Sequence, residues 1–155
     1  MILDCSPLIA ILADEPDAER YIQAISHAPR CRISAGNFIE LAIVIESQFG
    51  DEVAGQCDAL FRRIGIIIEP VTVEQSHVAR QAFHDFGKGR HAAALNFGDC
   101  FAYALAKVTG EPLLFKGDDF KKTDITAALK HMAPASGKGS PLRPRKADRR
   151  SALPS

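Results

Sequence analysis

The chain has 155 residues, of which 46% are apolar, and its 19 basic residues balance 19 acidic ones. This size and composition predict one globular domain with one core, and no stretch approaches the roughly 20 apolar residues of a membrane span. The first residues lack the positive charge of a signal peptide, so we expect a cytoplasmic protein without a membrane association. The four cysteines (Cys5, Cys31, Cys57 and Cys100) form no C-x-x-C pair, and we expect reduced, partly buried thiols.

In chain order, the apolar patterns alternate between strands and helices. They predict a strand at 1–5, helices at 7–13 and 17–28, a strand at 31–34, helices at 37–49 and 52–63, a strand at 64–69, helices at 72–86 and 98–108, and a strand at 112–115. This alternation indicates the α/β class, in the form of an α/β/α sandwich around a mostly parallel sheet.

Local signals support several of these boundaries. Ser6 and Pro7 resemble an N-cap followed by a proline in the first turn, and Thr72 with Gln75 has the spacing of a capping box. The three isoleucines at 66–68 form a continuous apolar run, which predicts a strand covered on both faces.

The charge is unevenly distributed along the chain. Residues 133–155 hold six basic residues and one acidic residue, a net +5, so residues 1–132 carry −5. We expect residues 1–131 to form the folded domain and residues 132–155 to be a disordered basic tail, because the tail has few large apolar residues. The tail either attracts RNA by its charge or has no specific role.

Acidic residues occur at positions where a parallel sheet binds ligands. Asp4 follows the first strand and Asp118 and Asp119 follow the last, so they should meet at one sheet edge. Asp99 opens a helix, and Glu40 lies among apolar residues on another. Each acid alone also has an ordinary explanation, as a helix cap, a turn residue or the polar edge of a helix. Together they indicate a site for a hard cation, Mg²⁺ or Mn²⁺.

Four segments carry a resemblance to a known family. The most specific run is Asn96-Phe97-Gly98-Asp99-Cys100, and the matching segments are residues 1–6, 34–41, 87–91 with 95–106, and 113–120. The sequence resembles PIN-domain ribonucleases, and among them the VapC toxins of bacterial toxin–antitoxin pairs. The resemblance covers residues 1 to about 131.

The resemblance implies that Asp4, Glu40 and Asp99 are catalytic residues that bind Mg²⁺ or Mn²⁺, with Ser6 supporting the site. Many members carry an aspartate where this chain has Gly117. We therefore expect Asp118 to be the fourth catalytic acid, and Asp119 is the alternative.

The implied activity is a metal-dependent endoribonuclease that cleaves tRNA, rRNA or mRNA as the toxin of a toxin–antitoxin pair. The implied protein partners are a cognate antitoxin, which inserts a basic peptide into the acidic site, and a second copy of the chain. For RNA binding we expect Lys88, Arg90 and Lys116, with Lys121 and Lys122 next. The five histidines show no metal-ligand spacing and are expected at the surface.

Three other functions are alternatives to a metal-dependent ribonuclease. A haloacid-dehalogenase-like phosphatase would need an aspartate two residues after Asp4, where this chain has Ser6. A catalytically degenerate PIN-fold binding module gains weight from Gly117 and would not cleave RNA. Cleavage of DNA is distinguished by comparing RNA with DNA oligonucleotides.

Overall fold

The computed structural model describes residues 1–129. Its centre is a four-stranded parallel sheet with the order β3-β2-β1-β4. Ile2 in β1 pairs with Arg32 on one side and with Leu113 on the other. The strands are short: β1 (Ile2–Leu3), β2 (Arg32–Ser34), β3 (Ile67–Glu69) and β4 (Leu113–Leu114).

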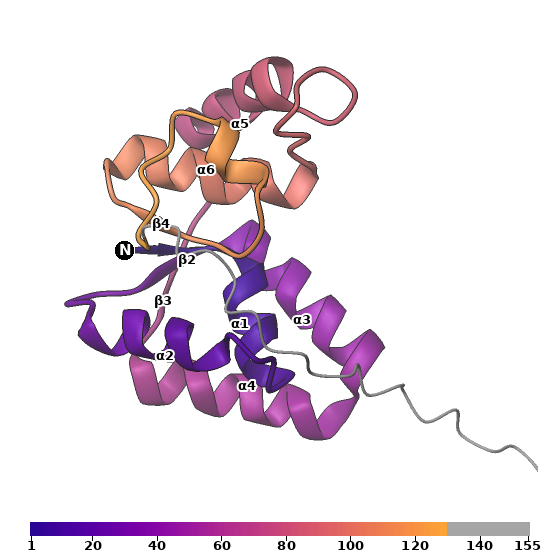
Figure 1. Ribbon diagram of the computed structural model, residues 1–155, viewed down its shortest axis with the longest axis vertical. Coiled ribbons are helices and arrows are strands. Elements are labelled where there is room, and N and C mark those ends of the chain that lie inside the picture. The colour runs from indigo at the N-terminus through magenta and orange to yellow at the C-terminus, as the bar shows by residue number, and fades with distance from the viewer. Residues whose placement is uncertain (130–155) are drawn as a thin grey trace, which may run out of the picture.

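Helices cover both faces of this sheet. Figure 1 shows α5 and α6 on one side and α1 to α4 on the other, which confirms the expected α/β/α sandwich. The helices are α1 (Cys5–Leu12), α2 (Ala18–His27), α3 (Ala35–Phe49), α4 (Asp51–Ile64), α5 (Val73–Phe86) and α6 (Phe97–Thr109), followed by the 3₁₀ helix η1 (Asp119–Lys122).

Consecutive strand residues belong to different cores, as the two-residue period of a strand requires. Ile2 and Leu113 pack into the cluster that includes residues of α5 and α6. Leu3 and Leu114 pack into the cluster that includes residues of α1 to α4. All four side chains are fully buried, so β1 and β4 are held rigidly at the centre of the molecule.

The expectation for residues 66–68 was wrong. Ile66 is buried, but Ile67 and Ile68 are 41% and 42% exposed. β3 lies at an edge of the sheet, and among the described residues no further segment bridges to its free side. The free side of β4, the other edge strand, is bridged by Ala127. An apolar run does not by itself tell an edge strand from a central one.

The start of α1 also differs from the expectation. The helix begins at Cys5, and its N-cap is Asp4, whose carboxylate accepts a hydrogen bond from the Ser6 backbone. Asp4 has the extended backbone of an N-cap, with φ −82° and ψ 166°, so Ser6 lies inside the first turn. Thr72 caps α5 as expected, with its side chain accepting from the Gln75 backbone.

The remaining expectations concern the cysteines, the histidines and the tail. The four cysteines are buried and free of disulfide bonds, and the four histidines within residues 1–129 are exposed, as expected. No helix in that range has the length and apolar character needed to cross a membrane. His131, the predicted domain boundary at 131 and the basic tail lie outside the described residues.

Candidate active site

The site lies where the direction of the chain through the sheet reverses. From β1 the chain passes to β2 and then outward to β3, and it returns with β4 on the other side of β1. In open parallel sheets such a reversal leaves a crevice at the carboxyl ends of the two strands on either side of it, here β1 and β4. Asp4 directly follows β1, and the segment from Phe115 to Asp119 follows β4. The sheet therefore brings the first and last acids of the sequence pattern to one edge.

Asp4 is buried and tightly held. Its carboxylate oxygen Oδ2 accepts hydrogen bonds from the Ser6 backbone at 3.0 Å and from the Ser6 hydroxyl at 2.5 Å. The side chain is only 6% exposed. Burial raises the pKa of Asp4, and the hydrogen bonds from Ser6 oppose part of this rise.

Asp99 is fixed by a reciprocal capping box at the start of α6. Its Oδ2 accepts from the Asn96 backbone at 2.7 Å, and its own backbone donates to the Asn96 side chain at 2.9 Å. Burial, together with the negative charges of the other acids, raises the pKa of Asp99 to about 6. Capping explains the orientation of Asp99, but it does not require burial beside other carboxylates.

Glu40 on α3 points toward the site. Its Oε2 lies 3.5 Å from the Asn37 side-chain nitrogen and 3.5 Å from the Cys5 sulfur. The negative charge of Glu40 contributes to the raised pKa of Asp99. A Glu40 side chain that projected into solvent from the polar edge of its helix would not lie beside Asn37 and Cys5.

The two candidates for the fourth acid occupy different environments. The charge of Asp119 raises the pKa values of both Asp4 and Asp99. The side chain of Asp118 is 74% exposed, and its carboxylate accepts a 2.6 Å hydrogen bond from the Lys121 ammonium. Gly117, whose φ is 95°, forms the turn directly before these two aspartates. Both side chains are exposed, and the charge of Asp119 acts on the buried Asp4 and Asp99, whereas Asp118 pairs with Lys121.

Asn37 and Gly98 lie beside Glu40 and Asp99, a position that was not predicted from the sequence. Asn37 is fully buried, and its side-chain nitrogen donates to the Gly98 carbonyl at 2.9 Å. A polar residue three positions before Glu40 lies on the same face of a helix. That spacing in an otherwise apolar segment was the available signal for Asn37.

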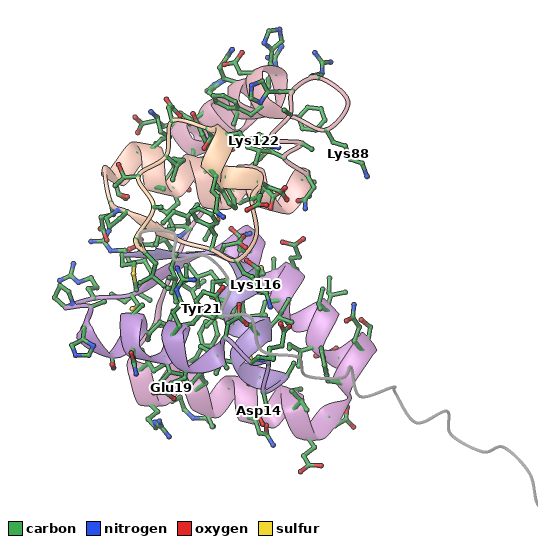
Figure 2. All side chains as sticks on the ribbon, viewed as in Figure 1. Asp14, Glu19, Tyr21, Lys88, Lys116 and Lys122 are labelled. Carbon is green, nitrogen blue, oxygen red and sulfur yellow. The ribbon has the colours of Figure 1, made fainter. Side chains whose placement is uncertain are left out.

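The basic residues expected to bind RNA also differ in their surroundings. Lys88 and Arg90 are exposed on the loop between α5 and α6, with the Arg90 guanidinium 5.9 Å from the centre of the Phe83 ring. The Lys88 backbone donates to Leu95 at 2.9 Å, which anchors this loop one residue before the cap of α6. Figure 2 shows Lys88 on the α5–α6 part of the molecule.

Lys116 lies between the two helical layers and is engaged in ion pairs (Figure 2). Its ammonium contacts the carboxylates of Glu15 and, at 3.2 Å, Asp17. Its backbone donates to the Ser6 hydroxyl at 2.9 Å. These contacts connect the end of β4 to α1 and to the segment before α2.

The donor set fits a hard divalent cation in its chemistry. In the part of the chain that the structure describes, no lysine or arginine forms an ion pair with Asp4, Glu40 or Asp99. The buried Oδ1 of Asn37 also has no hydrogen-bond partner there, as is common beside bound water or an ion. Within residues 1–129, however, no three His, Cys, Asp or Glu side chains are grouped to hold a metal ion as they stand.

Comparison with known proteins defines the class of this protein. The PIN domain family model matches residues 1–125, and the chain therefore belongs to the PIN-domain family. Among solved structures, Mycobacterium tuberculosis VapC20, described as a toxin that cleaves the sarcin–ricin loop, has a TM-score of 0.66 at 17% identity. The match covers 81% of this chain and 95% of the VapC20 chain. A toxin–antitoxin complex from Klebsiella pneumoniae has a TM-score of 0.61 at 13% identity, with coverages of 84% and 98%. These two likenesses show the fold.

Closer relatives narrow the assignment. A protein named ribonuclease VapC from Mycolicibacterium smegmatis is 48% identical over 127 residues, which cover 82% of this chain and 98% of that protein. Ribonuclease VapC30 from Mycobacterium tuberculosis is 46% identical over 130 residues, with coverages of 83% and 99%. Within the PIN-domain family, the chain therefore belongs with the VapC ribonucleases.

Proposed function

We propose that this protein is a Mg²⁺- or Mn²⁺-dependent endoribonuclease and the toxin of a toxin–antitoxin pair. The observation that carries the proposal is the position of the buried Asp99 near Asp4, Glu40 and Asp119, whose negative charges all raise its pKa. Negative charges held close together destabilise a folded protein. Their presence at one place therefore indicates a functional site. The names of the 46–48% identical relatives support RNA as the substrate.

In this proposal, the carboxylates of Asp4, Asp99 and Glu40 would hold the cation, and Asp119 would complete the site. The bound cation would activate a water molecule and stabilise the charge on the scissile phosphate. Ser6 keeps Asp4 in a fixed orientation through two hydrogen bonds. The capping box does the same for Asp99, so the chain fixes two of its acids before any cation binds.

An acidic site that binds a polyanion needs positive charge at its rim. Lys88 and Arg90 are our proposed phosphate contacts, because both are exposed on the loop that leads into α6. The ends of the loop are joined by a 2.9 Å backbone hydrogen bond, which the Leu95 amide donates to the Phe86 carbonyl. Lys116 is a weaker candidate, since its charge is already matched by Glu15 and Asp17.

The proposed substrates are tRNA, rRNA or mRNA, which places the activity in the cytoplasm. The proposed antitoxin would contribute a basic segment to the site, in keeping with the net charge of −5 on residues 1–132. The toxin–antitoxin complex among the structural neighbours supports this partner.

The decisive experiment compares the protein with its Asp99→Asn variant on total RNA, with Mg²⁺, with Mn²⁺ and with EDTA. We expect cleavage at defined sites by the unaltered protein alone, and a loss of roughly 100-fold or more in Asp99→Asn. Asp14→Asn is the matched control, because Asp14 is exposed and asparagine tolerates its φ of 50°. Equal cleavage by Asp99→Asn, or cleavage in EDTA, would remove the proposed site. No cleavage by the partner-free protein would favour the degenerate binding module.

A homodimer is also proposed, with the exposed apolar side chains Ile39, Ile43 and Phe97 in its contact. They are 58%, 60% and 79% exposed, and α3 and α6 pack against each other. Burial of such side chains by a second copy would be favourable. Light scattering should give twice the monomer mass, and Ile43→Asp should reduce it to the monomer mass. Val73→Asp, which alters an even more exposed apolar residue on α5, should leave the dimer intact.

A further inference from the structure

The carboxylate of Glu40 occupies the space that a side chain at position 98 would fill. Gly98 is the second residue of α6 and is buried. A Cβ atom built on Gly98 would lie less than 3.0 Å from both carboxylate oxygens of Glu40, a separation that real Cβ atoms essentially never show. Any larger residue at position 98 would therefore displace the Glu40 side chain.

The conformation of the backbone does not account for this glycine. Gly98 is not among the residues with positive φ, and it lies in a regular helix, where alanine is favoured over glycine. Space, rather than backbone freedom, is what the position requires. Gly98 lowers the stability of the helix, but it leaves room for the Glu40 carboxylate.

Asn37 forms a second wall of the same space. Its side-chain nitrogen donates to the Gly98 carbonyl at 2.9 Å and lies 3.5 Å from Glu40 Oε2. The Cys5 thiol donates to the Asn37 carbonyl at 3.1 Å and lies 3.5 Å from the same Glu40 oxygen. Asn37 thus joins the first turns of α3 and α6, the two helices that carry Glu40 and Asp99.

We infer that Gly98 is a positioning residue. Because it has no side chain, the Glu40 carboxylate can lie near Asp99, where Asn37 holds it. The inference rests on the proposed function in one respect, namely that this carboxylate contributes to cation binding. The steric relationship itself does not depend on any activity.

The first test measures thermal unfolding in EDTA. Gly98→Ala should lower the Tm by several degrees in the native background. The same substitution in the Glu40→Ala background should not lower it, because the methyl group then meets no carboxylate. In the Glu40→Gln background, which keeps the bulk and removes the charge, the Tm should fall as in the native background. Gly55→Ala in α4, where a Cβ meets nothing within 4 Å, is the matched control and should raise the Tm by about 3 °C.

The second test measures Mn²⁺ affinity by calorimetry. Gly98→Ala should weaken binding by about tenfold, as expected when a group that supports a metal site is disturbed. The double variant Gly98→Ala/Glu40→Ala should bind no more weakly than Glu40→Ala alone, because both changes remove the same carboxylate. Gly55→Ala should bind Mn²⁺ like the unaltered protein.

The outcomes separate this inference from the proposed function. An equal change in Tm for Gly98→Ala in the native and Glu40→Ala backgrounds would overturn the steric relationship. Unchanged Mn²⁺ affinity in Gly98→Ala would overturn its positioning role. If the unaltered protein neither binds Mn²⁺ nor cleaves RNA, the proposed function fails and takes the positioning role with it, while the Tm comparison still decides the steric relationship.

Discussion

The Ser6 hydroxyl accepts a 2.9 Å hydrogen bond from the Lys116 backbone, which connects the first turn of α1 to the end of β4. The same hydroxyl donates to Asp4 at 2.5 Å. One small side chain therefore links the acid that follows β1 to the segment that leads to Asp119. This relationship gives Ser6 a specific role in holding the two parts of the site together.

Replacing Ser6 by alanine should reduce kcat/KM for RNA cleavage by about 10- to 100-fold, the range for residues that orient metal ligands. The free energy of unfolding should fall by about 1–2 kcal/mol, because the buried Asp4 loses one donor and the Lys116 amide loses its acceptor. Ser6→Thr keeps the hydroxyl and should retain most of the activity. Equal losses in Ser6→Thr and Ser6→Ala would show that the hydroxyl is not what matters.

The adjacent acids Asp118 and Asp119 should behave differently. Asp119→Asn removes a charge that acts on Asp4 and Asp99, so we expect weaker Mn²⁺ binding and a loss of activity of about 10- to 100-fold. Asp118→Asn alters an exposed carboxylate bound to Lys121 and should change little. Calorimetry and cleavage rates on one RNA substrate would measure both. A larger loss in Asp118→Asn would reverse our choice of the fourth acid.

The sequence was sufficient to predict the layers of the fold and the sheet edge that Asp4 and the acids after β4 share. Apolar periodicity marks strands and helices, and parallel strands end at one edge, so Asp4 and the acids after β4 could be placed together. The order of the strands has no such local signal, and the edge position of β3, with Ile67 exposed, was therefore missed.

Details of the site depend on contacts between distant segments. Whether Asp118 or Asp119 faces the other acids is decided by the turn after β4, not by residue type. The space between Gly98 and Glu40 depends on how α3 packs on α6, and these residues are 58 positions apart in the chain. Such relationships cannot be derived from the periodicity of either helix.

The raised pKa of Asp99 predicts a pH dependence of stability in the metal-free protein. A carboxyl group whose pKa is raised by folding binds its proton more tightly in the folded state. Its contribution to stability is therefore largest below the ordinary value of 3.8, falls as the pH rises to about 6, and is constant above that. In EDTA at pH 7, Asp99→Asn should be more stable than the unaltered protein by about 1–2 kcal/mol.

Urea unfolding between pH 4 and 7.5 would measure this difference. It should shrink as the pH falls, and Mg²⁺ should stabilise the unaltered protein more than Asp99→Asn at pH 7. The buried Asp4 shifts in the same direction and remains in both proteins, but Asp99→Asn also removes a charge that acts on it, so the difference reports Asp99 together with its interaction with Asp4. Parallel pH curves for the two proteins would contradict the electrostatic origin of the effect.

Lys116 and Arg90 should differ in their contributions to RNA binding. Lys116→Met removes the ion pairs with Glu15 and Asp17 at a partly exposed position, so the free energy of unfolding should fall by about 0.5–1 kcal/mol. RNA affinity, measured in the cleavage-deficient Asp99→Asn background, should keep its salt dependence. Arg90→Ala should weaken RNA binding and reduce the slope of log K against log salt by about one, as expected for a lost phosphate contact. The reverse pattern, with the slope lowered by Lys116→Met and not by Arg90→Ala, would move the proposed RNA path from the α5–α6 loop to the junction between the two helical layers.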